Sequence, residues 1–179
     1  MIAIIYSTGA GHTAALARLI AEAMAPLHEV KLIDVAGMNA ADWQALDRAE
    51  AIVFGAPTYM GSVAAGFKEF MDESSDRWSQ QRWADKLAAG FTIATYPSGD
   101  KLSSLTQLAV FAAQHGMVWV GARGIAPAGA GREAENWQGA WLGLMATSSR
   151  DKTVLIDTGD AAAARQFGAR IAGFCARLR

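Results

Sequence analysis

The first six residues, Met1–Tyr6, form an almost unbroken apolar run, and a polar stretch with two glycines, Ser7–Thr13, follows directly. Such a run is typical of a strand buried on both faces, as in a parallel sheet with helices on either side. Beyond it, apolar residues recur every three or four positions, which predicts an amphipathic helix over Thr13–Ala25. The chain therefore begins with a strand, a loop and a helix, the unit from which α/β folds are built.

The same alternation continues along the chain. Strands are predicted at Val30–Asp34, Ala51–Gly55, Ala88–Tyr96 and Met117–Val120, and helices at Asn39–Ala49, Val63–Met71, Leu102–His115 and Asp160–Leu178. Two stretches fit neither pattern: Ser74–Asp85 is polar but holds two tryptophans, and Ala122–Asp157 is long and rich in glycine. We expect a single α/β domain over residues 1–179, with three layers and right-handed crossovers.

Composition narrows the possible partners. The chain has 179 residues, 52% of them apolar, and a net charge of −1, which argues against disorder and against attraction to nucleic acid. It has no apolar run of the roughly 20 residues that cross a bilayer, so no membrane partner is expected. Its one cysteine, Cys175, excludes an intrachain disulfide, and neither His28 nor the acidic residues have metal-ligand spacing. We expect a soluble, cytoplasmic protein without a metal.

Ligands of open parallel sheets bind beyond the carboxyl ends of the strands, which selects the loops Ser7–Thr13, Ala56–Ser62 and Tyr96–Lys101. The first loop combines glycines, hydroxyl side chains and the start of a helix, a combination that favours a phosphate dianion. It lacks the lysine of nucleoside-triphosphate loops and the spaced glycines of dinucleotide sites, so a monophosphate fits best. The alternative is an ordinary turn with a Ser or Thr cap.

The second loop joins a stiff Pro57 to a glycine at position 61, which lets backbone approach a flat ligand. By itself this loop fits two interpretations equally well: a ligand-binding loop, and a plain turn with Ser62 as a helix cap. Together with the helix that follows, it reads GAPTYMGSVAAGFKEFMD over residues 55–72 and resembles the flavodoxin superfamily. It is most similar to the tryptophan-repressor-binding-protein type of NAD(P)H:quinone oxidoreductases and related FMN reductases. Pro57, Thr58, Gly61, Phe70, Met71, Asp72, Trp78 and the stretch Gln114–Met117 carry the resemblance.

The resemblance implies a flavodoxin-like three-layer fold with a five-stranded parallel sheet in the order 2-1-3-4-5. It also implies one FMN per chain and hydride transfer from NAD(P)H to a quinone-like acceptor. The residues it implies for the FMN phosphate are Ser7, Thr8, Ala10, Gly11, His12 and Thr13. Those it implies for the isoalloxazine are Pro57, Thr58, Tyr59, Met60 and Gly61, with Tyr96, Pro97, Ser98, Gly99 and Asp100 on the pyrimidine side.

Two further residues are implied by the resemblance rather than by local pattern. Trp78 corresponds to a tryptophan that reaches the flavin of a neighbouring subunit in a homodimer or homotetramer, and His115 to a histidine near the nicotinamide. The alternative for His115 is a helix-terminal histidine that complements the helix dipole. No side chain is expected to act as a covalent catalyst, because the flavin carries the chemistry.

The sequence departs from the family pattern at Ala10, where a hydroxyl residue is usual, and in the third loop, which holds one glycine instead of a run. Two other functions stay open: a flavodoxin-type electron carrier and, because of Ala10, a flavin-free interaction protein. Trp137 and Trp141, in the long glycine-rich segment, are expected either to pack on the body or to cap the flavin or a subunit contact.

Overall fold

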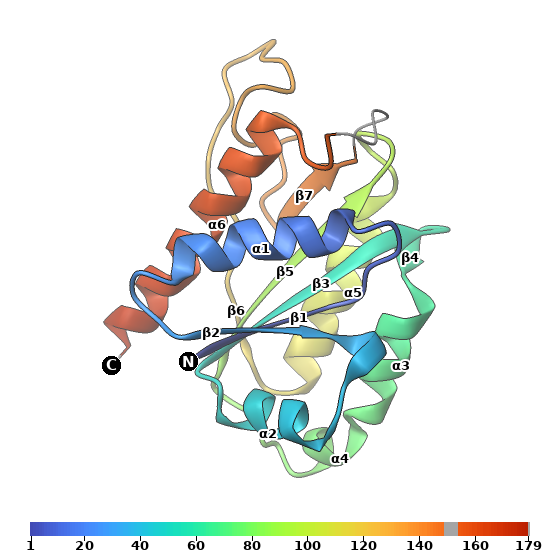
Figure 1. Ribbon diagram of the computed structural model, residues 1–179, viewed down its shortest axis with the longest axis vertical. Helices are drawn as coiled ribbons and strands as arrows, with labels where there is room; N and C mark the ends of the chain where they lie inside the picture. Colours follow the sequence, from blue (N-terminus) through green and yellow to red (C-terminus); the bar gives the residue numbers. More distant parts are fainter. Residues whose placement is uncertain (149–153, 179) are drawn as a thin grey trace.

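The computed structural model describes residues 1–148 and 154–178 and shows one sheet with helices on both faces (Figure 1). Part of the predicted irregular segment Ala122–Asp157, residues 149–153, lies outside the described residues. The strands are β1 (Ile2–Tyr6), β2 (Val30–Asp34), β3 (Ala51–Tyr59), β4 (Ser62–Val63), β5 (Leu87–Ala94), β6 (Val118–Trp119) and β7 (Leu144–Thr147). The helices are α1 (His12–Met24), η1 (Val35–Gly37), α2 (Ala40–Arg48), α3 (Ala65–Glu73), α4 (Ser75–Ser79), α5 (Lys101–Gln114) and α6 (Thr158–Arg177).

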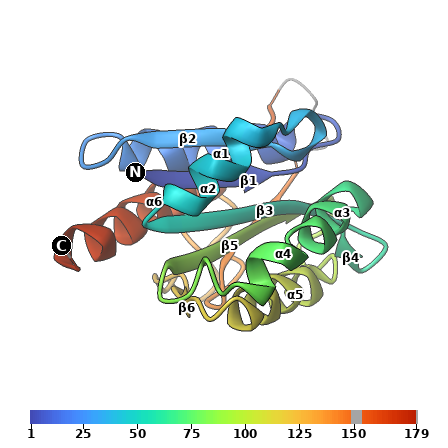
Figure 2. The same ribbon diagram turned by 90° about the horizontal axis from the view of Figure 1, so that it is seen from below.

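The strand order confirms the predicted fold. The sheet runs β2-β1-β3-β5-β6 with every neighbouring pair parallel, and the first four of these strands follow one another in Figure 2. Strand β4 pairs antiparallel with the end of β3, and β7 pairs parallel with β5. No helix in the described part of the chain is long and apolar enough to cross a bilayer.

The fifth position of the sheet is shared by two strands. Strand β6 pairs with the start of β5, where Val118 lies opposite Leu87, and β7 pairs with its end, where Leu144 lies opposite Phe91. The predicted strand Met117–Val120 is thus only the first part of this edge. Residues 121–143 leave the sheet between the two parts, after the Val120 amide has donated to the Ala88 carbonyl of β5, and we call this segment the insertion.

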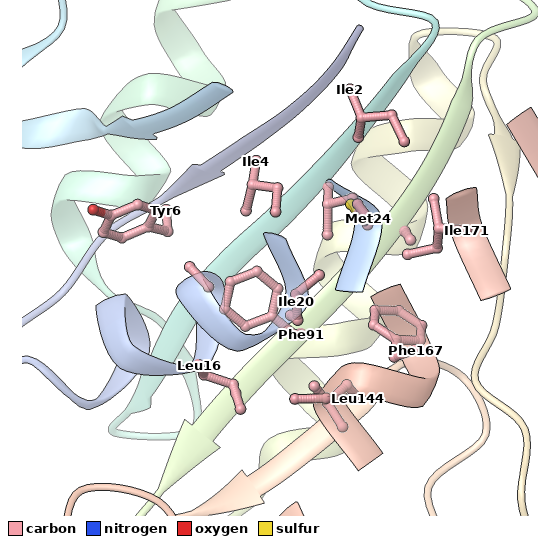
Figure 3. Close-up of a cluster of buried hydrophobic side chains, with 14 of the residues drawn as sticks. Ile2, Ile4, Tyr6, Leu16, Ile20, Met24, Phe91, Leu144, Phe167 and Ile171 are labelled. Atoms are coloured by element: carbon pink, nitrogen blue, oxygen red, sulfur yellow. The ribbon is translucent and has the colours of Figure 1, made fainter. Parts of the chain in front are cut away.

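Alternate residues of the buried strands serve opposite faces of the sheet. Ile2 and Ile4 pack with α1 and α6 in the cluster of Figure 3, whereas Ala3 and Ile5 face α2, α3 and α5. The second face is aromatic, and Phe54, Phe67, Phe70, Trp83 and Phe111 are all buried there. Two-sided burial of a parallel sheet explains why the strands show as continuous apolar runs in the sequence.

The prediction of a loop over Ala56–Ser62 was wrong. Strand β3 continues through Pro57 to Tyr59, and a two-residue turn leads into β4. Because β1 ends opposite Gly55, Pro57 has a strand neighbour only on the β5 side and its missing N–H is tolerated. Met60 and Gly61 both have positive φ, 49° and 77°, as expected for a type I′ hairpin turn.

Candidate functional site

The first loop lies between β1 and α1 and leads into the amino end of that helix. Gly11, with φ 91°, is the N-cap of α1 and has no side chain to accept a hydrogen bond. The Thr8 hydroxyl accepts from the Ala14 amide at 3.4 Å, and the Ala15 amide donates to the Gly11 carbonyl. Within residues 1–148 and 154–178, the amides of His12 and Thr13, in the first turn, have no hydrogen-bond acceptor, and the positive end of the helix dipole there favours an anion.

Two buried polar atoms of this loop lack a partner among the described residues: the Ser7 Oγ and the His12 Nε2. Buried polar side chains are normally hydrogen-bonded, so each such atom asks for an explanation. Both atoms lie on residues that flank the exposed glycine and alanine at positions 9 and 10. Ser7 lines the cavity on the Asp34 side of the loop and His12 the cavity toward the end of β5, so each atom offers a polar position near the start of α1, which fits an anion such as the monophosphate that the sequence predicts.

The β3–β4 hairpin lies against this loop. A Cβ at Gly9 would overlap the hydroxyl of Tyr59, so the Tyr59 ring rests directly on the loop backbone. Tyr59 is about half exposed and Met60, at the tip of the turn, is fully exposed. The hairpin therefore offers an aromatic ring and an apolar tip to a flat ligand beside the phosphate position.

Thr58 uses its side chain inside the protein. Its hydroxyl lies 2.8 Å from both the Thr92 and the Ser104 hydroxyl, in a buried cluster that ties β3 to β5 and α5. This leaves the backbone of Thr58 as the part that can face a ligand. Sequence reasoning missed the cluster because its three hydroxyls come from separate elements.

The third loop, Tyr96–Asp100, is largely exposed and ends in two residues of positive φ, Gly99 at 52° and Asp100 at 53°. Tyr96 exposes 63% of its surface. A left-handed conformation is uncommon outside glycine, but aspartate adopts it more readily than most residues, so Asp100 suits the turn before α5. Helix α5 begins at the next residue.

The three predicted segments lie at the carboxyl ends of β1, β3 and β5, which form one edge of the sheet. A cavity of about 200 Å³ joins the first loop and the hairpin to the end of β5, and a second of about 340 Å³ lies on the Asp34 side of the same two elements. A larger cleft of about 950 Å³ opens between the third loop, α5 and the insertion. Residues that the sequence analysis did not select also line the first two cavities: Ile93, Ala94, Thr95 and Ser148 in one, and Asp34 in the other.

His115 is not brought to these loops. It lies at the far end of α5 from the third loop, is 1% exposed, and stacks on Trp83 with ring centroids 4.5 Å apart. Ser74 donates its hydroxyl proton to the Met71 carbonyl, so the His115 Nε2–H donates to Ser74 Oγ at 3.0 Å. Burial lowers the pKa of His115 to about 4, which keeps the ring neutral. These contacts give His115 a place in the aromatic core.

Trp78 also lies apart from the loops of its own chain. It belongs to α4, at the bottom of Figure 1, whereas β4 at the end of β3 lies higher, at the right of the same view. Its ring is half exposed and borders a groove of about 560 Å³ between α3, α4 and α5. Contact between Trp78 and a flavin of a neighbouring subunit stays a prediction.

Comparison with known proteins agrees with this geometry. The family described as a flavodoxin domain matches residues 3–115. Flavodoxin FldP of Pseudomonas aeruginosa (strain UCBPP-PA14) is 40% identical over 175 residues, covering 94% of this chain and 93% of that protein. The chain therefore belongs to the flavodoxin family.

Three further similarities concern a quinone dehydrogenase and two solved structures. An NAD(P)H dehydrogenase (quinone) of Archaeoglobus fulgidus is 35% identical over 72 residues, 40% of this chain and 38% of that protein. The crystal structure of a flavodoxin, WrbA-like protein from Agrobacterium tumefaciens superposes with a TM-score of 0.79 and 32% identity, covering 99% of this chain and 98% of that one. An archaeal flavodoxin, 19% identical with a TM-score of 0.66, shares the fold.

Proposed function

We propose that this chain is an FMN-dependent oxidoreductase that transfers hydride from NAD(P)H to a quinone-like acceptor. The observation that carries the proposal is the first loop, in which the Ser7 Oγ and the His12 Nε2 are buried without a described partner beside the start of α1. FMN ends in a single phosphate dianion, the group that such a loop suits. The family membership supports the same cofactor.

The protein's own part in this function is to bind and shield. The first loop holds the phosphate, while the hairpin from Pro57 to Gly61 and the third loop from Tyr96 to Asp100 border the ring. FMN, when bound, supplies the redox chemistry. No side chain is assigned a catalytic role.

The large cleft favours a small-molecule substrate. Its volume of about 950 Å³ lies within the range of ligand sites, and it opens beside the loop that would border the flavin. The net charge of −1 gives little of the long-range attraction with which electron carriers dock on their partners. The partial similarity to NAD(P)H dehydrogenases (quinone) supports this reaction, and the proposal places the protein in the cytoplasm, where NAD(P)H is available.

A flavodoxin-type electron carrier is the second candidate. One observation favours it: the relative that matches nearly the whole chain is named a flavodoxin, whereas the relatives named quinone dehydrogenases match over 72 residues. Both candidates need FMN in the same site. They differ in whether the protein oxidises NAD(P)H by itself.

The test is flavin binding followed by turnover. The purified protein is titrated with FMN and FAD by fluorescence, and NADH or NADPH oxidation is then followed with benzoquinone as acceptor. Preferential FMN binding with steady turnover supports the reductase. FMN binding without turnover supports the carrier, and the absence of FMN binding would overturn both.

A matched pair of variants locates the phosphate. Thr13→Val removes a hydroxyl from the first turn of α1, and we expect it to weaken FMN binding about ten-fold. Thr106→Val removes a hydroxyl that donates to the Leu102 carbonyl within α5, and should change the affinity little. Equal affinities in the two variants would remove Thr13 from the site.

A further inference from the structure

A fully buried lysine follows the third loop. Lys101 is the first residue of α5, directly after Asp100, and its side chain is 0% exposed. Its ammonium group donates to the Ala146 carbonyl at 3.0 Å, to the Thr147 hydroxyl at 3.1 Å and to the Gln138 Oε1. The three protons of Lys101 are thereby used on β7 and on the insertion, so the start of α5 is fastened to both.

A buried carboxylate faces this lysine from the other side. Asp160, in the first turn of α6, is 1% exposed and accepts from the Thr147 amide at 2.7 Å and the Trp137 Nε1 at 2.9 Å. The Gln138 Nε2 donates to the same carboxylate at 3.2 Å. The Gln138 amide thus bridges the two buried charges, with its oxygen on Lys101 and its nitrogen on Asp160.

Such a network requires a reason other than stability. Taking two charges out of water is expensive, and buried ion pairs often contribute less than an apolar replacement would. What a fully hydrogen-bonded polar network provides is one defined arrangement of the segments that it joins. Here those segments are the third loop with α5, the insertion, β7 and α6.

The network lies at the cleft beside the third loop. Residues of the third loop (Pro97, Ser98 and Asp100), Lys101 at the start of α5, and Trp137 and Gln138 of the insertion all line the cleft. Gly99 and Asp100 hold left-handed conformations just before Lys101, so the shape of the third loop depends on where α5 begins. A shift of Lys101 would move the loop and the insertion relative to each other.

We propose that Lys101, Gln138 and Asp160 form a lock through which the insertion fixes the third loop against the flavin ring, with Lys101 as a positioning residue. This inference rests on the proposed function for its flavin, and on the hydrogen bonds above for the lock itself. Lys101 acts on the ring through the loop and makes no contact with the phosphate site. Loss of the lock should therefore weaken the binding of the ring, whatever the flavin carries at its other end.

The charge on Lys101 can be removed by a moderate rise in pH. Burial lowers its pKa to about 8, with Asp160 of α6 acting in the opposite direction and Arg132 of the insertion adding to the decrease. Strand β7 has no titratable side chain near the Lys101 ammonium group. Asp100, in the third loop, precedes Lys101 along the chain. Raising the pH through 8 removes the positive charge and weakens the attraction that Gln138 relays to Asp160.

The first experiment measures the lock without flavin. Trypsin has two exposed targets in the insertion, Arg123 and Arg132, and mass spectrometry reports cleavage at each. We expect Lys101→Met to speed this cleavage about five-fold or more, because cleavage requires local opening of the insertion. The matched control is Lys86→Met, since Lys86 also gives its protons to three carbonyls, those of Leu46, Asp47 and Ala49, at the amino end of the sheet.

The second experiment measures the affinity of the protein for the flavin ring. Riboflavin and FMN are titrated by fluorescence into both lysine variants, and we expect Lys101→Met to weaken both flavins by the same factor, about ten-fold. Lys86→Met should change neither affinity, and Thr13→Val should weaken FMN alone. In the wild type, riboflavin affinity should fall above pH 8, and Lys101→Met should remove this pH dependence.

The outcomes separate the two claims. If the wild type binds neither flavin, the proposed function fails while the proteolysis still decides whether the lock exists. Cleavage no faster in Lys101→Met than in Lys86→Met would overturn the lock, and faster cleavage with unchanged riboflavin affinity would overturn its role in positioning. Gln138→Met keeps the lysine but removes the bridge, and it replaces Lys101→Met in the proteolysis and affinity comparisons, but not in the pH comparison, if that variant does not fold.

Discussion

The hydroxyl of Tyr59 occupies the place where a side chain on Gly9 would begin. Gly9 belongs to the first loop and Tyr59 ends β3, so the two elements that would hold the phosphate and the ring of one flavin are in direct contact. Gly9 does not need its conformational freedom here, since its φ lies outside the left-handed region. The requirement for glycine is therefore one of space.

Gly9→Ala should disturb both loops at once. We expect it to lower the free energy of unfolding by about 1 kcal/mol and to weaken FMN binding, because Tyr59 must swing away from the added methyl group. Denaturant unfolding and a fluorescence titration measure the two effects. As a control, Gly66→Ala adds a methyl group that meets no atom within 4 Å in α3, and should stabilise the protein by about 0.5–1 kcal/mol.

Tyr59→Phe should rescue the Gly9→Ala variant. Without the hydroxyl, the nearest ring atom, Cζ, would be 3.4 Å from the new Cβ, at the edge of ordinary contact. The loss from Gly9→Ala should therefore be smaller in the Tyr59→Phe background, as a double-mutant cycle would measure. An equal loss in both backgrounds would show that the collision with the hydroxyl is not the cause.

Ser7→Ala should have opposite effects on stability and on binding. The Ser7 Oγ is buried without a described partner, so its removal should leave the flavin-free protein equally stable or more stable by up to about 1 kcal/mol. FMN affinity should fall about ten-fold, while riboflavin affinity, which involves no phosphate, should stay the same. A stability loss without any change in FMN affinity would assign Ser7 a structural role instead.

Acid should destabilise the fold through His115. Its pKa in the folded protein is about 4, below the ordinary value of 6.5, so the unfolded chain binds more protons between these pH values. The stabilising contribution is complete above pH 6.5 and is lost as the pH falls to 4, up to about 3 kcal/mol.

His115→Phe isolates this contribution. The ring keeps its place beside Trp83 but cannot titrate. The unfolding free energy of the wild type minus that of the variant should therefore be constant above pH 6.5 and fall as the pH is lowered below it. A difference that is independent of pH from 7 to 4 would contradict the assignment.

The sequence predicts the parallel sheet well because each buried strand is a continuous apolar run. Met1–Tyr6 and Ala51–Gly55 are apolar on both faces, and the following helices have a clear period, so the pattern itself predicts a parallel sheet. The strand order was implied by the resemblance to the flavodoxin superfamily. The extension of β3 was missed because Pro57 looks like the end of a strand. Pro57 is tolerated inside β3 because β1 ends opposite Gly55, and this pairing belongs to the tertiary structure.

The division of the fifth strand was missed for a similar reason. Leu144–Thr147 is four residues long and gains its identity as a strand only from its pairing with β5. The first loop could be selected from its glycines and hydroxyls, because the chemistry is local. The Lys101–Gln138–Asp160 network could not, because its members are far apart along the chain and none stands in a recognisable motif.

Trp78 provides the last prediction, which concerns assembly. Its indole is half exposed on α4 and borders the groove between α3, α4 and α5, together with Val110, which is also about half exposed. Tryptophan is a preferred anchor of protein interfaces, and we propose a homodimer or homotetramer in which Trp78 is buried by a neighbouring chain near its flavin. Trp78→Ala should weaken assembly by about 2 kcal/mol, which light scattering over a concentration series measures, and should alter turnover with quinone.

Trp141→Ala is the control for this prediction. It removes another half-exposed indole, one that donates to the Gly124 carbonyl within the insertion, and should leave assembly unchanged. A wild type that stays monomeric at micromolar concentration would contradict the assembly, and an oligomer that Trp78→Ala leaves intact would assign Trp78 to packing within its own chain.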